Sequence, residues 1–521
     1  MAKTRGTGLL MVWADIDPEF EAEYHRWYDE EHIAHLLAVP GFLSAGRYVA
    51  LKGSPKYLAL YELADAALIN VLERAVRDGR AHVILTNTSS TDPNPNRTPD
   101  DQHQPVIWDT ENDPARTALH AAAGDQTPER VIDRMFTNSA RIGHNKFAVY
   151  VKDGTANAVM TGSTNWTETG LCTQSNNVIL IEDDAVAGDY WEYWKGLRDD
   201  PQPPREPLTV TIKGNEVTGA AGNSAKQGAA LRTADAAPPA ERALSGSARA
   251  KLWRSPNTPE TAVPAHNPRR PPDLDEVYQL MDNARDAIFF LTFLPGVSGT
   301  NNIIGEAAAL AAKPDGPLVL GAISDPSAMP PPSDGDDPNA NYVDEHGVTR
   351  KLPPPAIWWP EGQQSRVVMI RAAAVHIPFG NFRPELLTAG HAIIHDKIIV
   401  IDPCSARDCA VITGSHNLGY KASYCNDDNL VIVRGNRPLA ISYAVHVLDL
   451  YDHYVFRARL EQNLRNQLKS GQIHSFAQAA AQSDPHGLLH LTADWQKSHF
   501  QQNRPRSSLD YFLDHTDQVV G

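Results

Sequence analysis

Hydrophobic positions along the second half of this chain follow two periods, and each change of period marks an element. Apolar residues at helical spacing predict helices over 273–284, 304–312 and 439–457. Short runs rich in β-branched residues predict strands over 287–293, 317–323, 390–401 and 430–433. Strands that alternate with helices are typical of a sheet that contains parallel strands and carries helices on its faces. The pattern therefore predicts a mixed α/β fold.

The N-terminal part has a different order of elements. It reads as a strand over 8–13, a helix over 17–37 and two strands over 42–51 and 56–63. Strand, helix, strand, strand is the first part of a ferredoxin-like α+β unit. A helix over 66–77 and a strand over 81–85 either complete that unit or begin the next domain.

The middle of the chain combines polar stretches with short periodic ones. Residues 88–115 are rich in Asp, Asn, Pro and Thr and predict a long loop. After them we expect a helix over 127–136, strands over 143–151 and 178–181, and a helix over 190–197. Five segments follow from these patterns: a ferredoxin-like module (1–65), a first α/β half (66–198), a linker rich in Ala, Gly, Ser and Thr (199–250), a second α/β half (251–462) and a helical tail (463–521).

Two polar motifs each occur twice, at nearly the same offset. The first copy consists of His144, Lys146, Ser163 and Asn165, and the second of His395, Lys397, Ser415 and Asn417, each Ser being preceded by Gly. One His-x-Lys would be a weak signal, but two copies with Gly-Ser-x-Asn downstream indicate an internal duplication.

The residue types in this motif suit the chemistry of a phosphoryl group. Alternation along a strand puts His395 and Lys397 on one face, where two polar side chains are costly without a partner. A pseudo-twofold arrangement would bring two His, two Lys, two Ser and two Asn to one central site. Lys, Ser and Asn can stabilise the charged phosphoryl oxygens, one neutral His can attack phosphorus, and the other, when protonated, can donate to the leaving oxygen. We expect neither a metal nor a cofactor.

The doubled His-x-Lys and Gly-Ser-x-Asn pattern resembles the phospholipase D superfamily over roughly 66–460. The resemblance implies two pseudo-symmetric α/β/α halves with one shared active site, and a covalent phosphohistidine. By this analogy His144 is the nucleophile and His395 the general acid. The family pattern also has an Asp five places after Lys, which is Asp402 in the second copy but Val151 in the first.

An acid shortly after the Asn is a further part of the family pattern. Asp428 supplies it in the second copy, whereas the first copy has Asn176. Such an acid would orient a His by accepting its other N–H, as the Asp of a catalytic triad does. We therefore include Asp402 and Asp428 among the supporting residues of the site. The first copy is the less complete of the two.

Residues 24–42 of the opening module resemble the EthD and dimeric α/β-barrel type of ferredoxin-like protein. The resemblance lies in Trp-Tyr-x-x-Glu-His, which begins at Trp27, and in Val-Pro-Gly-Phe, which begins at Val39. Members of that family usually pair their sheets, which implies a homodimer through this module. A metal site at the three histidines of the helix is the less favoured interpretation, since a motif alone carries a high false-positive risk.

Composition limits the expected binding partners and the expected cellular location of the chain. The formal charge of −16 argues against a broad nucleic-acid footprint. The N-terminus meets acidic residues too early for a signal peptide, and we therefore predict a cytoplasmic location. The cysteines include no Cys-x-x-Cys pair; Cys404 and Cys409 would be bridged in an oxidising compartment or remain reduced thiols.

The leading functional hypothesis is a phosphodiesterase, either hydrolysing or transferring, that acts on a phospholipid with transient contact to a membrane surface. The apolar segments 289–294 and 357–360 favour lipid. One alternative is a nuclease of the same superfamily. The other is a non-catalytic dimeric binding or scaffold protein with a degenerate site.

Overall fold

A computed structural model describes most of the two motif-bearing regions and part of the N-terminal region. The described residues are 8–14, 21–37, 42–49, 57–63, 69–86, 113–126, 129–134, 136, 141–167, 170–171, 174–200, 204–205, 209–212, 215–218, 222–223, 227–266, 268–296, 302–330, 337, 339–361, 368–372, 394–481, 492, 497 and 507–515. The chain divides into two compact units, Met1–Leu85 with Thr110–Ile132, and Thr86–Asp109 with Asp133–Gly521. The predicted boundary between 65 and 66 therefore lies inside the first unit.

The first unit begins with an antiparallel sheet and a helical segment. Its first elements are β1 (Gly8–Ala14), α1 (Glu21–Trp27), a π-helical turn (Tyr28–His32), α2 (Ile33–Leu37), β2 (Phe42–Val49) and β3 (Tyr57–Leu63). The sheet order is β1-β3-β2. Strand, helix, strand, strand is thus the order predicted from the sequence, while the relation to EthD-type proteins stays a prediction.

Two helices and a short two-stranded sheet complete the first unit. The elements are α3 (Ile69–Arg77), β4 (Val83–Leu85), α4 (Asp113–Ala123), a 3₁₀ turn (Gly124–Gln126) and β5 (Val131–Asp133). The helix predicted over 127–136 is wrong, because the β-branched Val131 and Ile132 pair with β4 and Val131 is fully buried against α3 and α4. In the predicted loop 88–115, residues 88–112 lie outside the described part, and 113–115 belong to α4 instead.

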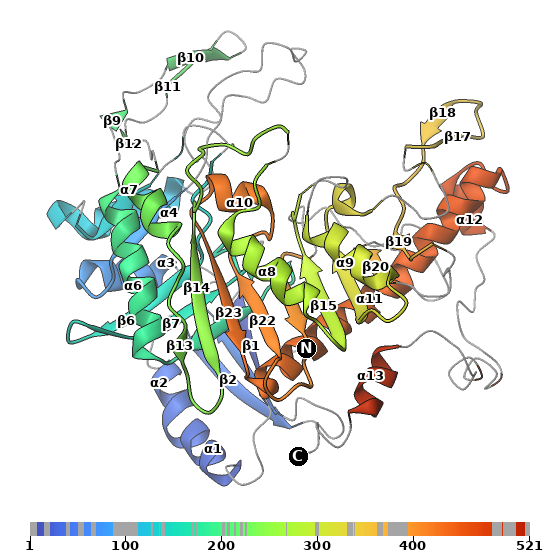
Figure 1. Cartoon of the computed structure of the whole chain (residues 1–521). Helices are drawn as coiled ribbons and strands as arrows, with labels where there is room; N and C mark the ends of the chain where they lie inside the picture. Colours follow the sequence, from blue (N-terminus) through green and yellow to red (C-terminus); the bar gives the residue numbers. More distant parts are fainter. Residues whose placement is uncertain are drawn as a thin grey trace. The chain divides into compact units, whose positions relative to one another are not determined.

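The second unit contains a mixed sheet to which nine of the described strands belong (Figure 1). In sheet order they are β13 (Arg242–Ala243), β14 (Arg249–Ser255), β23 (Asp428–Arg434), β22 (Ala410–Gly414), β21 (Ile398–Ile401), β15 (Ala287–Thr292), β16 (Leu318–Ile323), β20 (Met369–Arg371) and β19 (Ile357–Trp358). Strands β15, β16 and β20 are parallel neighbours, and the other pairs are antiparallel. The predicted parallel-containing sheet is therefore present.

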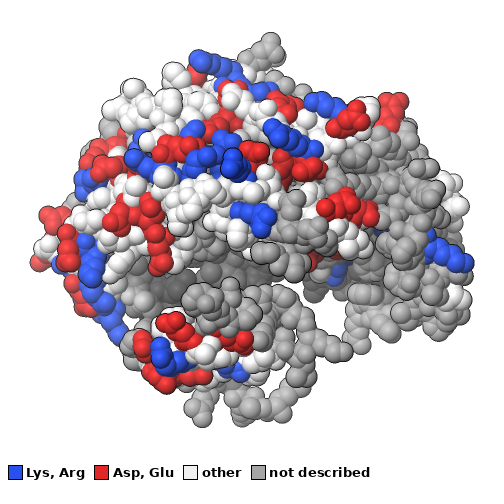
Figure 2. Space-filling model, turned by 60° about the horizontal axis from the view of Figure 1, so that its bottom comes forward, with Lys and Arg blue, Asp and Glu red and all other residues white. Residues whose placement is uncertain are grey.

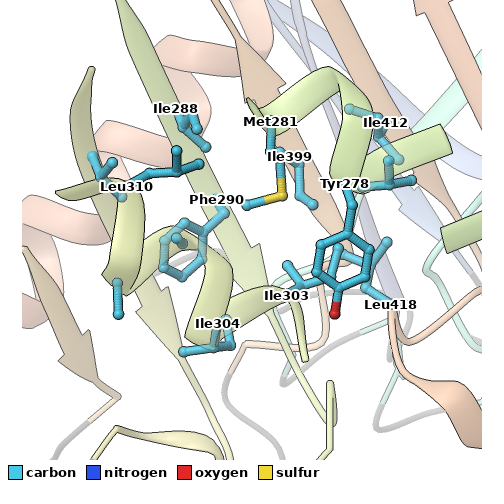
Figure 3. Packing of buried hydrophobic residues seen from close by; sticks show 14 of the residues in the cluster. Tyr278, Met281, Ile288, Phe290, Ile303, Ile304, Leu310, Ile399, Ile412 and Leu418 are labelled. Carbon is cyan, nitrogen blue, oxygen red and sulfur yellow. The ribbon is translucent and has the colours of Figure 1, made fainter. Parts of the chain in front are cut away.

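Helices cover both faces of this sheet. On one face α8 (Pro272–Asp282) and α9 (Ile303–Ala312) pack onto alternate strand residues such as Ile288, Phe290 and Ile399, the cluster drawn in Figure 3. On the other face the long helix α11 (Arg437–Ser470) packs onto the intervening residues, among them Phe289 and Val400. Since every residue of β15 is buried, the strand has apolar side chains on both faces.

A second, three-stranded sheet carries the first motif. It consists of β6 (Phe147–Lys152), β7 (Thr155–Gly162) and β8 (Val178–Ile181), all antiparallel, followed by α6 (Asp184–Asp199). The second motif is followed by β21, β22 and β23 in the same antiparallel order and then by α11. The matching order of strands and helix in the two halves is the pseudo-symmetry that the doubled motif predicted.

The linker predicted over 199–250 is wrong for its C-terminal part. Residues 227–250 form α7 (Ala229–Asp235), β13 and the start of β14. Arg232 is buried and donates hydrogen bonds to the carbonyls of Thr258 and Tyr424, and Asp235 pairs with Arg254. Small residues suggested flexibility, but these buried polar contacts fix the segment. The remainder contains β9 (Pro204–Arg205), β10 (Thr209–Ile212), β11 (Asn215–Thr218) and β12 (Gly222–Asn223).

The remaining elements lie within residues 325–360, between β22 and β23, and in the C-terminal tail. They are a 3₁₀ turn (Pro326–Ala328), β17 (Asn341–Val343), β18 (Thr349–Lys351), α10 (Tyr420–Cys425), α12 (Phe476–Ala481) and α13 (Ser508–Asp514). Cys404, Cys409 and Cys425 are buried free thiols, so the first two are not bridged. No helix in the described part of the chain is long and apolar enough to cross a membrane.

Candidate active site

The two His-x-Lys segments lie just before β6 and β21, and the backbone of the opposite half holds each of them. The backbone N–H of His144 donates to the carbonyl of Asp427 at 2.8 Å, and that of His395 donates to the carbonyl of Ser175 at 2.9 Å. Parallel bridges join Gly143 to Asp427 and Ser175 to Ile394. The pseudo-symmetric halves therefore exchange contacts at their motifs.

The side chains of the histidines cross between the halves in the same way. Nδ1 of His144 lies 2.8 Å from Oδ1 of Asp428, and Nδ1 of His395 lies 2.8 Å from Oδ1 of Asn176. Because both oxygens accept, each Nδ1 carries the proton and each Nε2 remains for chemistry. The two ring centroids are 6.5 Å apart. The structure thus brings together four residues that the sequence placed in two separate motifs.

Glycine is required at the first position of Gly-Ser-x-Asn. Gly162 and Gly414 have φ values of +151° and +131°, and a Cβ there would lie 2.1 Å from the carbonyl oxygen of Asn177 or 2.4 Å from that of Asn429. Without a side chain the strand end can approach this backbone closely. The following Ser N–H groups then donate to the same two carbonyls, each at 3.0 Å.

The serines hold the partners of the histidines. Ser415 Oγ donates to Oδ1 of Asp428 at 2.6 Å, and Ser163 Oγ donates to Oδ1 of Asn176 at 2.9 Å. Oγ of Ser415 also accepts the backbone N–H of Asn429, and Oγ of Ser163 accepts that of Asn177. A hydroxyl has one proton to donate. The serines therefore position Asp428 and Asn176, and their contact with a phosphoryl group stays a prediction.

The two lysines place positive charge in a buried region. Nζ of Lys146 donates to the carbonyl of His144, and Nζ of Lys397 to that of His395, both at 2.5 Å. Burial lowers the pKa of Lys146 to about 7. Burial, together with repulsion from Lys146, also lowers the pKa of Lys397 well below its usual value. A bound anion would relieve this repulsion, so the site favours one.

The ionisation of the histidines follows from the same environment. Burial, and then the charge of Lys146, lowers the pKa of His144 to about 4, although Asp428 opposes the shift. Burial and the charge of Lys397 lower the pKa of His395 still further. For Asp428 burial favours the neutral acid, but the contact with His144 outweighs it and lowers its pKa. Near neutral pH the site therefore holds a carboxylate beside a neutral imidazole.

Three predicted supporting residues lie outside this network of hydrogen bonds. The carboxylate of Asp402 accepts the backbone N–H groups of Arg285, Asp286 and Ala287 at 2.8–2.9 Å, so it fixes the start of β15. Asn165 and Asn417 are half-buried and hold neither histidine. A buried Oδ1 of Asn417 has no hydrogen-bond partner within the described residues.

Several contributors were missed by the sequence analysis. Asn176 was noted only as the place of a missing acid, yet it bonds His395. Asn429 accepts from the hydroxyl groups of Thr161 and Tyr190. The ring of Phe293 lies 5.0 Å from the ring of His395 and 5.1 Å from Nζ of Lys397. The equal offset of Asn176 and Asp428 from their motifs was the available signal.

A metal site is a separate question from this network. Within the described ranges, no three His, Cys, Asp or Glu side chains are arranged to hold a metal ion.

A family comparison agrees, over part of the chain, with the resemblance stated from the motifs. Residues 54–198 match a family model described as "Cardiolipin synthase, PLD-like domain". The chain is also similar to the solved structure of phosphatidylserine synthase from Haemophilus influenzae Rd KW20, at 10% sequence identity and a TM-score of 0.34, over 85% of this chain and 97% of that one. No curated protein matches the sequence. The family match bears out a phospholipase D-like domain over residues 54–198, and the structure itself has the predicted mixed α/β fold.

Proposed function

We propose that this chain, which carries a phospholipase D-like domain, cleaves a phosphodiester in two steps through a phosphohistidine at His144. One observation carries the proposal: the two histidines face each other across a pseudo-twofold, each with its Nδ1 proton held from the opposite half. Their unequal partners, a carboxylate for His144 and an amide for His395, support two different roles.

In the first step, the lone pair on Nε2 of His144 forms a bond to phosphorus while the bond from phosphorus to the leaving oxygen breaks. Nε2–H of His395 gives its proton to that oxygen. The imidazole of His144 becomes positively charged, and the carboxylate of Asp428 compensates this charge. The amide of Asn176 offers no such compensation, so His395 is the better group to release a proton.

In the second step, water or an alcohol attacks phosphorus and the bond to Nε2 of His144 breaks. His395 takes the proton of the attacking hydroxyl, which returns both histidines to their starting state. Water gives hydrolysis and an alcohol gives transfer. The same residues serve both outcomes, so the acceptor decides between them.

His395 must carry a proton when the substrate arrives. Burial and the charge of Lys397 lower its pKa. A bound phosphodiester brings a negative charge, which opposes both the repulsion between the lysines and the loss of the proton from His395. Substrate and proton therefore bind together, and the lysines then face the phosphoryl oxygens.

A phospholipid is the proposed substrate class. The ring of Phe293 borders His395 and Lys397, and the next residue, Leu294, is 45% exposed. Of the apolar segments first taken to favour lipid, 289–292 and 357–358 are buried in strands, so Phe293 and Leu294 carry that argument. The name of the matching family model, cardiolipin synthase, also favours a phospholipid.

Surface charge favours lipid over nucleic acid. The net charge is −16, and on the face drawn in Figure 2 the described Lys and Arg side chains are interspersed with Asp and Glu. A nucleic-acid groove would need a continuous basic surface. Transient contact with a membrane surface, and a homodimer through the N-terminal module, remain part of the proposal.

A metal-free assay on two substrates tests the proposal. The purified chain is incubated with EDTA, once with vesicles of phosphatidylglycerol and phosphatidylcholine and once with single-stranded DNA. We expect phosphatidic acid, or a transferred phosphatidyl group when glycerol is added. The His144→Ala variant should form neither product. Cleavage of DNA alone would replace lipid by nucleic acid, and no turnover of either substrate would favour a binding protein.

A further inference from the structure

The residue between His395 and Lys397 is a buried acid on the opposite side of the segment. Asp396 is fully buried, and neither of its carboxylate oxygens has a hydrogen-bond partner within the described residues. Nε2 of His446, on α11, lies 3.5 Å from Oδ1 of Asp396. A buried carboxylate is costly unless a cation compensates it. His446, whose side chain is 39% exposed, is placed to be that cation.

The first half has a neutral pair at the corresponding place. Asn145 is the middle residue of the first His-x-Lys, and its Nδ2 donates to the hydroxyl of Tyr193 on α6 at 2.9 Å. Its Oδ1 accepts from Nδ2 of Asn429, also at 2.9 Å. Asn145 is therefore held by two hydrogen bonds between neutral groups, which do not depend on charge.

An equivalent Tyr–Asn contact in each half indicates how α6 corresponds to α11. Tyr190, three residues before Tyr193, contacts Asn429 through its hydroxyl at 3.1 Å. Tyr443, three residues before His446, contacts Asn177 through its hydroxyl at 3.2 Å. By this spacing, Tyr193 of α6 corresponds to His446 of α11.

We propose that Asp396 and His446 form an ion pair that positions the second His-x-Lys segment, where the first half uses a neutral hydrogen bond. This inference rests on the proposed function: the ion pair can affect turnover only if the chain is an enzyme. Asp396 and His446 are positioning residues, since the contacts of His395 and Lys397 with the site lie on the other side of the segment.

Neighbouring groups set how the pair responds to pH. Asp396 is faced by Lys397 from its own segment and by Tyr443 and His446 from α11, and Asp449 acts on His446. Burial opposes a charge on His446, but the carboxylate of Asp396 outweighs it and raises the pKa of His446. Because the folded pKa then lies above the unfolded value, the stabilisation is complete below about pH 6.5 and is lost as pH rises through the raised pKa.

Above that pH the carboxylate of Asp396 no longer faces a charged His446, and we expect the second segment to be held less firmly. Turnover should then decline on the alkaline side for a reason that lies outside the reacting atoms. The first half, with its neutral pair, should not contribute such a decline.

Replacing Asp396 and His446 by Asn and Tyr, the residue types at the corresponding positions of the first half, tests this inference. The variants are Asp396→Asn, His446→Tyr, the double variant Asp396→Asn/His446→Tyr, and Asp449→Asn as a matched control on α11. We expect His446→Tyr alone to lower Tm by at least about 3 °C at pH 6. The double variant should recover most of this loss. Because Asp449 raises the pKa of His446 less than Asp396 does, Asp449→Asn should lower that pKa less than Asp396→Asn.

The readouts separate this inference from the proposed function. NMR titration of the histidines should place the pKa of His446 above 6.5 in the wild type and lower it in Asp396→Asn. The fall in Tm between pH 6 and pH 9 should be smaller in the double variant than in the wild type. An unshifted pKa, or the same fall in Tm in the double variant, would overturn the ion pair even in an active enzyme. Normal pH behaviour of the pair in a chain without turnover would instead reject the proposed function.

Discussion

Nδ1 of His144 lies 2.8 Å from Oδ1 of Asp428, although 284 residues separate them in the sequence. The acid that follows the second motif thus serves the histidine of the first. The reciprocal contact, from His395 to Asn176, has an amide in place of the acid. Because the first copy has Asn176 where the second has an acid, the histidine of the second copy has an amide partner and no carboxylate partner.

Asp428→Asn should lower kcat by about 10² to 10⁴ with little change in KM, because the amide cannot compensate the positive charge on the phosphorylated His144. Steady-state kinetics on a dispersed phosphodiester measures this effect. The matched variant is Asn176→Asp, which supplies a carboxylate to His395 and should raise its pKa. A loss of equal size in both variants would contradict unequal roles for the two histidines.

The leaving group distinguishes the two histidines. With a p-nitrophenyl phosphodiester the leaving oxygen needs no proton, so His395→Ala should retain formation of the phosphoenzyme while His144→Ala loses it. Acid-labile ³²P on the protein measures the intermediate. It should accumulate in His395→Ala, because His395 is also the base for the second step.

Label on the His144→Ala variant and none on His395→Ala would reverse the assignment. The double variant serves as the blank. Near-UV circular dichroism of each variant confirms that the fold is intact.

The sequence predicted which residues form the site better than it predicted the hydrogen bonds between them. Histidine and lysine on strand-like segments, with Gly-Ser downstream, were enough to predict a shared site with two His and two Lys. The exchange of partners between halves requires the parallel bridges at Gly143 and Ser175, and spacing within one copy cannot reveal these. For the same reason the contacts of Ser163 with Asn176 and of Ser415 with Asp428 were not predicted.

Fold prediction was most successful where apolar periodicity was strong, as in β15, β16 and α11. It failed where buried polar contacts decide the structure. Small residues over 227–250 indicated a linker, yet Arg232 and Asp235 are buried there with partners from distant segments. Propensity carries no information about such partners.

Asp402 should behave as a structural residue. Its carboxylate accepts three backbone N–H groups at the start of β15, and Asp402→Ala would leave these donors without that acceptor. We expect a loss of about 3 kcal/mol in the free energy of unfolding, measured by urea denaturation. The kcat of the folded fraction should change less than threefold, in contrast to Asp428→Asn. A loss of kcat without a loss of stability would return Asp402 to the catalytic group.

The lowered pKa of Lys146 leads us to expect opposite effects of pH on anion binding and on stability. Because its folded pKa is about 7, tungstate should bind with constant affinity below that pH and up to tenfold more weakly per pH unit above it. The folded pKa lies below the unfolded value of about 10.4, so the buried charge destabilises the fold most at or below pH 7, and this cost fades as pH rises toward 10. Lys146→Met should therefore raise Tm at pH 6, gain little at pH 10, and bind tungstate weakly at both. Calorimetric titration and thermal melts measure the two effects, and an unchanged Tm at pH 6 would contradict a buried, strained lysine.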